Sequence, residues 1–114
     1  MAALNLDHLK KIVGDDPAFI RQVLQIFIRN TPKDMSALIE SVNKNNYEQV
    51  SFYAHKLKSA AGAIGYDQAY EDFKKIEFKA KNLNSMEEIE KEVSKLSKDC
   101  MACMVDIENI MNAL

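Results

Sequence analysis

Apolar residues recur along most of the chain at intervals of three and four positions, the spacing that gathers side chains on one face of an α-helix. The first such segment is short. It ends at Gly14, a residue that commonly terminates helices. No segment of the chain shows the alternation of apolar and polar residues that is typical of a β-strand. The apolar positions of this first predicted helix are Leu6, Leu9, Ile12 and Val13.

Two prolines mark the next helix starts. Asp16-Pro17 and Thr31-Pro32 each place a capping side chain before a proline, whose missing N–H costs nothing in the first turn of a helix. The sequence predicts helices over about 17–30 and about 32–45, or one kinked rod if the two join at Pro32. Their expected inward residues are Ile20, Val23, Leu24, Phe27 and Ile28, then Met35, Leu38, Ile39 and Val42.

Three more helices follow. They are expected over about 47–64, closed by Gly65, over about 67–83, and from the turn and cap at Asn84-Ser85 to the end of the chain. The inward residues are Val50, Ala54, Leu57, Ala61 and Ile64 in the first, and Ala69, Phe73, Ile76, Ala80 and Leu83 in the second. The last helix carries a heptad stripe made of Ile89, Val93, Leu96, Cys100, Cys103, Ile107, Ile110 and Leu114.

Long amphipathic helices with short connections predict an all-α fold, an antiparallel up-down four-helix bundle with a short extra N-terminal helix. The 114 residues are enough for one domain with one core, spanning residues 1–114. Hydrophobic residues make up 47% of the chain and there are only 3 glycines and 2 prolines, which argues against disorder. Because the net charge is −2, no overall positive field favours nucleic acid or anionic membranes, and we expect neither as a partner.

The cellular compartment is predicted from three features. Residues Met1–Asp7 reach an acidic residue before any long apolar run, unlike a secretory signal. No stretch approaches the roughly 18 apolar residues of a membrane span. Two cysteines do not make a disulfide framework, so we expect a reducing, cytoplasmic location.

Cys100-Met101-Ala102-Cys103 could indicate a redox or zinc site, but no second pair at metal spacing accompanies it. Both cysteines fall on the apolar stripe, so we expect buried thiols. None of the predicted stripes contains Glu or His, the ligands of a metal site inside a helix bundle. We therefore expect neither a metal nor another cofactor. His8, beside Asp7, is expected to be a surface residue.

His55 occupies a different position. At 100° per residue from Val50, the apolar residues of its helix cluster within about 40° of zero, whereas His55 lies at about 140°, away from the core. Glycine inside a helix costs about 1 kcal/mol relative to alanine, so the glycine nearby implies a packing or access requirement. The side chains expected on this outer side are Ser51, Lys58, Ser59 and Gly62.

An exposed imidazole can be neutral and nucleophilic at cellular pH. Phosphoryl transfer between a histidine and an aspartate of another protein needs mainly positioning and charge neutralisation. Lys58, three residues after His55, could supply the charge, as could Lys56 if its side chain swings round. The spacing alone favours an ordinary solvated face that contains one histidine over a phosphotransfer site.

The run His55-Lys56-Leu57-Lys58-Ser59-Ala60-Ala61-Gly62-Ala63-Ile64-Gly65 resembles the signature of histidine-containing phosphotransfer (HPt) domains. That family consists of single domains of about this size, built as four-helix bundles. The resemblance implies that His55 is the phosphoacceptor through an outward Nε2, and that Lys58 supports the phosphate. It implies a phosphoryl carrier of a two-component phosphorelay without kinase activity of its own. The implied partners are response-regulator receiver domains and a hybrid sensor histidine kinase, with no small-molecule substrate.

The resemblance also implies further features of the site. In the family a Gln or Glu of the next helix approaches the histidine, and counting without gaps puts Glu77 there, with Lys81 one turn later. Many members have Gly where this chain has Ser59, a departure that could shift partner choice. The receiver is expected to dock over Ser51, Ser59 and Gly62, with Phe52 and Tyr66 near the rim.

Two other functions remain open from the sequence. A helical adaptor would use the same bundle without carrying phosphate, and its binding would be indifferent to His55. A histidine-bearing substrate module of a larger kinase would share the chemistry of the phosphoryl carrier, because both accept a phosphoryl group on a histidine. The chain has no glycine-rich nucleotide-binding motif that would make it a kinase itself.

Overall fold

The computed structural model describes Leu4 and residues 6–114. The expectation about a leader at Met1–Asp7 falls largely outside these residues. The described residues form helices joined by turns, so the prediction of an all-helical chain is confirmed for this part. The helices are α1 (Leu6–Val13), α2 (Pro17–Asn43), α3 (Tyr47–Ala63), α4 (Asp67–Lys81) and α5 (Met86–Ala113).

Helix α2 replaces the two helices expected on either side of Pro32. Its start is as predicted, because the Asp16 side chain accepts a hydrogen bond of 3.0 Å from the backbone N–H of Ala18. Of the two alternatives at Pro32, the continuous rod is the one that forms, since Pro32 lies inside the helix and Thr31 is buried rather than capping. Burial of α2 residues both before and after Pro32 holds the two halves in one helix despite the missing backbone bond.

Two expected core positions are wrong. Leu83 is 69% exposed because α4 ends at Lys81 and the chain turns with a φ of 53° at Leu83, which takes this residue out of the helical register. Ile39 is exposed at the edge of the apolar stripe of α2. The remaining inward residues are buried or packed against the core, whose largest fully buried side chains include Leu9, Ile20, Leu24, Leu38, Leu57, Phe73, Ile76, Ile89 and Ile107.

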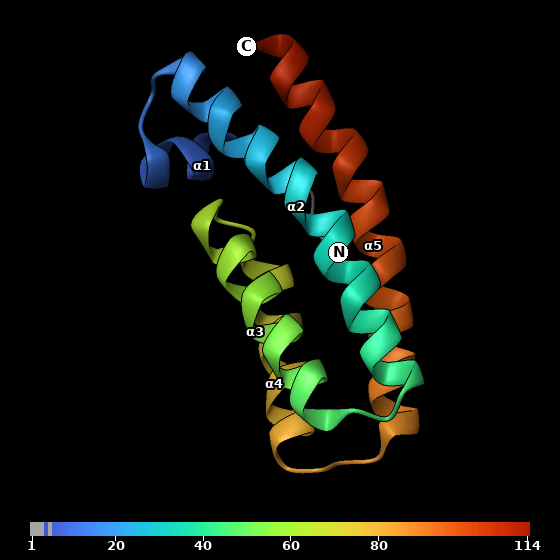
Figure 1. The fold of residues 1–114 in the computed structure, drawn as a ribbon. Coiled ribbons are helices and arrows are strands. Elements are labelled where there is room, and N and C mark those ends of the chain that lie inside the picture. Colours follow the sequence, from blue (N-terminus) through green and yellow to red (C-terminus); the bar gives the residue numbers. More distant parts are fainter. Residues whose placement is uncertain (1–3, 5) are drawn as a thin grey trace.

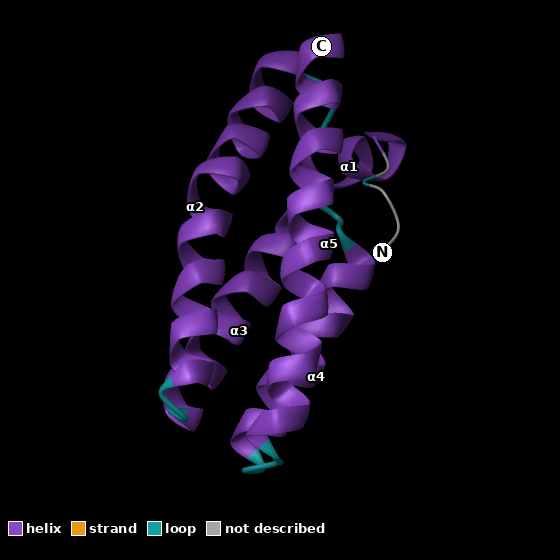
Figure 2. Ribbon diagram, turned by 90° about the vertical axis from the view of Figure 1, so that its right-hand side faces the viewer, coloured by secondary structure: helices purple, strands orange, loops and turns teal. Residues whose placement is uncertain are grey.

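The helices pack as an elongated body of 43 × 20 × 19 Å. Helix α3 packs most extensively on α4, while α2 contacts both α3 and α5, and α5 contacts α4. Figures 1 and 2 show that α2 and α5 run past one end of the shorter α3–α4 pair, where α1 lies. At the opposite end, the Tyr47 hydroxyl donates a hydrogen bond of 2.8 Å to the carbonyl of Asn84. None of the helices in the described residues is long and apolar enough to span a membrane.

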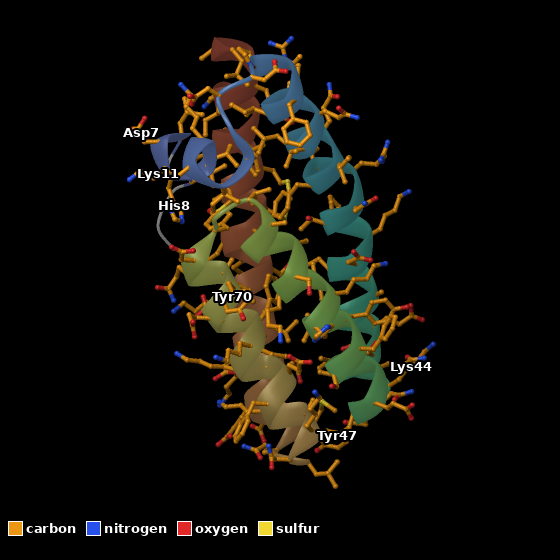
Figure 3. All side chains as sticks on the ribbon, turned by 90° about the vertical axis from the view of Figure 1, so that its left-hand side faces the viewer. Asp7, His8, Lys11, Lys44, Tyr47 and Tyr70 are labelled. Carbon is orange, nitrogen blue, oxygen red and sulfur yellow. The ribbon has the colours of Figure 1, made fainter. Side chains whose placement is uncertain are left out.

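Helix α1 closes the end of the bundle near the turn between α3 and α4 (Figure 3). Leu9 is fully buried. His8, expected at the surface, is partly exposed and places its Nε2 3.2 Å from a carboxylate oxygen of Asp67 at the start of α4. Gly65 sits beneath α1 with a φ of 74°, and a Cβ there would lie 2.7 Å from His8 and Ile12 side-chain atoms. The turn therefore needs glycine for both its backbone and its contact with α1.

A pair of glycine variants tests this packing. Gly14 also has a positive φ, of 94°, but nothing lies within 4 Å of where its Cβ would be. We expect Gly14→Ala to lower the free energy of unfolding by about 1–2 kcal/mol, the cost of a left-handed conformation. Gly65→Ala should cost more, because α1 must also shift. Urea unfolding of both variants measures the difference, and equal losses would show that α1 does not rest on this turn.

Candidate functional site

His55 lies in the middle of α3, a helix that begins where the Asn46 side chain accepts a hydrogen bond of 3.1 Å from the backbone N–H of Gln49. The apolar face of α3 is buried against the other helices, which fixes the direction of the opposite face. The His55 side chain is 60% exposed. A rigid helix thus presents this imidazole to solvent.

Glu77 of α4 holds one side of the imidazole. Its side chain is only 8% exposed, and its Oε2 lies 2.8 Å from Nδ1 of His55. The residue sits beside Ile76 on the buried face of α4, so the fold places a carboxylate at the edge of the core. With Nδ1 turned toward this buried group, Nε2 lies on the other side of the ring.

Two lysines share the same carboxylate. Lys58 of α3 donates to Oε1 at 2.7 Å and is itself only 17% exposed. Lys81, one turn beyond Glu77 on α4, places its Nζ 3.3 Å from Oε2 and is 63% exposed. The structure therefore brings His55, Lys58, Glu77 and Lys81 together into one cluster.

Glu77 is charged in this cluster. Burial by itself would raise its pKa, but hydrogen bonds from Lys58, His55 and Lys81 and the charge of Lys58 outweigh burial and leave the pKa below its ordinary value. An ionised carboxylate can only accept hydrogen bonds. In the neutral form of His55 the proton is therefore on Nδ1, and Nε2 carries the lone pair.

Lys56 is not part of the cluster. Its Nζ lies 3.1 Å from Oδ1 of Asp34, a largely buried residue of α2. One residue step along a helix turns the side chain by about 100°, which carries Lys56 away from the flank where His55 meets α4. A carboxylate buried in α2 needs a cation nearby, and Lys56 supplies it. The sequence contains no short-range signal for this contact.

The small residues near His55 have different surroundings. Ser59 is exposed, and Ser51 and Gly62 are half-buried. A Cβ at Gly62 would lie 3.2 Å from Cδ2 of Tyr70, so glycine lets this ring of α4 approach α3 closely. The unexpected glycine in the helix thus has a packing reason. Nothing in the local sequence indicates this contact of Tyr70, which Figure 3 labels on α4.

Phe52 and Tyr66, both expected at the rim of the docking surface, lie in different surroundings. Phe52 is exposed, and its ring meets that of Tyr53 edge to face with centroids 5.1 Å apart. Tyr66 is buried and its hydroxyl contacts the Cys103 sulfur, so its expected place on the rim is wrong. Tyr66 belongs to the turn that α1 covers, which draws its side chain into the core.

Cys100 and Cys103 are buried free thiols, as predicted. Burial, with nearby Asp99, raises the pKa of Cys100 to about 12; burial, with nearby Asp106, raises that of Cys103 to about 11. Thiolates, the reactive form, are therefore disfavoured. Within the described residues, no three His, Cys, Asp or Glu side chains come together as a metal site would require.

The charge on Glu77 gives a testable pH dependence. Because its folded pKa is lowered, the ionised carboxylate stabilises the fold above the ordinary glutamate range, and this contribution is lost as the pH falls through the folded pKa. We expect Glu77→Gln to cost about 1–3 kcal/mol at pH 7 and progressively less toward acid pH. Urea unfolding at several pH values measures this. The control is Glu90→Gln on the exposed surface of α5, and a loss at Glu77 that does not vary with pH would contradict the assignment.

Comparison with known families and proteins adds to this geometry. The family model described as Hpt domain matches residues 22–102, from within α2 to within α5. No curated protein and no solved structure matches the chain. The matched segment covers well over half of the 114 residues and contains all of α3 and α4, the two helices that carry the His55 cluster. The chain belongs to the Hpt domain family.

Proposed function

We propose that this protein accepts a phosphoryl group on His55 from an aspartyl phosphate of one receiver domain and passes it to another. Membership of the Hpt family implies a part in histidine phosphotransfer within phosphorelays. The observation that carries the proposal is the 2.8 Å contact between Nδ1 of His55 and the buried Glu77 carboxylate, on a ring that is 60% exposed. It supports Nε2 as the nucleophile.

In the proposed step the Nε2 lone pair attacks phosphorus. The bond between phosphorus and the aspartate oxygen breaks, and its electron pair stays on the aspartate as a carboxylate. Nδ1 keeps its proton, so the ring gains the positive charge of a substituted imidazolium. Glu77 already faces this nitrogen with a negative charge, and such a preorganised group stabilises charge that develops in the transition state. Delivery to the second receiver is the reverse step, and the carrier needs no kinase activity.

Lys58 is the proposed support for the phosphoryl group. It lies one turn from His55 on α3 and already occupies the cluster through Glu77. Turning its flexible side chain from Oε1 toward the phosphoryl oxygens would neutralise part of their charge. Lys56 would have to leave Asp34 to do the same, so we assign it a smaller part.

The receiver is proposed to dock over Ser51, Ser59 and Gly62, beside exposed Phe52.

We further propose that residues 1–114 form one domain in which α2 to α5 are an antiparallel up-down four-helix bundle, supported by their short connections and mutual packing. Response-regulator receivers and a hybrid sensor histidine kinase are the proposed partners. The proposed location is the cytoplasm, where such partners act.

One observation favours a second candidate function, that of a helical adaptor that binds a partner without carrying phosphate. A groove of about 310 Å³ between α2 and α5 is lined mainly by apolar side chains, among them Met35, Ile39, Met101 and Met104. Methionine-rich surfaces adapt to varied partners. An adaptor that used this groove would bind through residues of α2 and α5, and its binding would not depend on His55.

Replacing the proposed acceptor tests the function. The His55→Gln variant should take up no label from a phosphorylated receiver domain, because the amide lacks a nucleophilic nitrogen. The fold should survive, since the side chain lies outside the core. The matched control is His8→Gln, which removes the other histidine and should leave uptake unchanged. Transfer is followed by radiolabel, and the label should be labile in acid and stable in base.

The outcomes separate the two candidate functions. Uptake that needs His55 and not His8 establishes the carrier. Uptake that persists in a folded His55→Gln variant contradicts the assignment of the acceptor. No uptake by the wild type from a panel of receivers, together with partner binding that is indifferent to His55, would favour the adaptor.

A further inference from the structure

The two oxygens of the Glu77 carboxylate have different partners. Among the residues that the structure describes, Oε1 accepts from Lys58, at 2.7 Å. Oε2 is shared between Nδ1 of His55 at 2.8 Å and Nζ of Lys81 at 3.3 Å. The two donors on Oε2 therefore lie within about 6 Å of each other. Lys81 is placed on the Nδ1 side of the imidazole, and the phosphoryl group is expected on Nε2.

The pair of Glu77 and Lys81 differs from an ordinary helical ion pair. Glu40 and Lys44 of α2 have the same four-residue spacing and a shorter contact of 2.8 Å, but both side chains are about two-thirds exposed. Such exposed pairs contribute little because water solvates each partner. The Glu77 side chain is only 8% exposed, so water is poorly placed to replace a lost partner there.

Phosphorylation creates a conflict within the cluster. Lys58 is the main partner of Oε1, and the proposed function turns it toward the phosphoryl group. Glu77 would then keep a buried negative charge close to a second anion. From α3, His55 and Lys58 face the carboxylate, and Lys81 does so from its own helix; α5 meets α4 through a different pair, Lys79 and Glu92. Lys81 is then the remaining lysine on Glu77.

We propose that Lys81 is a positioning residue, which keeps Glu77 ionised and facing Nδ1 while Lys58 serves the phosphoryl group on His55. This inference rests on the proposed function. It divides the two lysines by role: the less exposed Lys58 moves between carboxylate and phosphoryl group, and Lys81 stays at Oε2. The alternative is that Lys81 only stabilises α4, as an exposed ion pair would.

The charge coupling can be measured without any phosphotransfer. Carboxyl carbon NMR of the unphosphorylated protein follows the titration of Glu77. Lys81→Met should raise the pKa of Glu77, since it removes one of the hydrogen bonds that lower it. Lys81→Arg should restore the titration. Lys44→Met, which removes the lysine of the exposed pair, should leave Glu77 unchanged. A Glu77 titration that is the same in Lys81→Met and wild type overturns the proposal.

The functional consequence is measured as the initial rate of phosphoryl uptake from a phosphorylated receiver between pH 5 and 8. Lys81→Met should lower the rate most at the acid end, where Glu77 of the variant begins to take up a proton, and less at pH 8, with little change in KM for the receiver. Lys81→Arg should recover most of the rate, and Lys44→Met should match wild type.

The outcomes distinguish a failure of the role proposed for Lys81 from a failure of the proposed phosphotransfer function. If Lys81→Met takes up label at the wild-type rate across the pH range while uptake still needs His55, the carrier function stands and the role of Lys81 is overturned. An equal loss of rate at every pH would indicate a structural role only and would likewise overturn it. If the wild type takes up no label from any receiver, the proposed function fails and the role of Lys81 fails with it.

Discussion

A carboxylate that is withdrawn from water has to be compensated by the groups packed around it, and Glu77 is compensated by His55, Lys58 and Lys81. Two of these partners come from α3 and one from α4, so the charge can be satisfied only when the two helices lie together. The rest of the site depends on this requirement. It fixes which nitrogen of His55 faces Glu77, and it holds Lys58 one turn away from His55 on α3.

The packing of α3 on α4 meets this requirement through specific residues. Gly62 has no side chain, and Tyr70 therefore lies close against α3. Gly65 takes the left-handed conformation that turns the chain from one helix to the next, beneath α1. These two glycines set how α4 sits against α3, and this setting carries Glu77 to His55 across 22 positions of sequence. Packing at one end of the helix pair thus positions chemistry in its middle.

Helical periodicity was sufficient to predict the helices and most of the core, because each helix buries one continuous stripe. It failed where tertiary contacts override local signals. Pro32 marks a boundary locally, yet burial on both sides carries α2 through it. Leu83 fits the stripe of α4 but lies beyond the turn that ends the helix. Tyr66 follows the signature closely in sequence, yet the end of the bundle draws it inward.

In the site, too, helical periodicity predicts some features and tertiary contacts determine the others. The outward direction of His55 follows from the geometry of a single helix, whereas the partner of Lys56 lies on α2 and that of Lys58 on α4, at separations that periodicity does not address. The placement of Glu77 followed from a resemblance and a gapless count, and the contact with His55 agrees with it.

In the proposed mechanism, buried Glu77 holds Nδ1 of His55 and leaves Nε2 to carry the phosphoryl group. The most direct test is NMR of the phosphorylated protein labelled with nitrogen-15 at histidine, in which coupling to phosphorus identifies the bonded nitrogen. We expect coupling to Nε2 of His55, with a proton retained on Nδ1. Coupling to Nδ1 of His55, or to either nitrogen of His8, would contradict it.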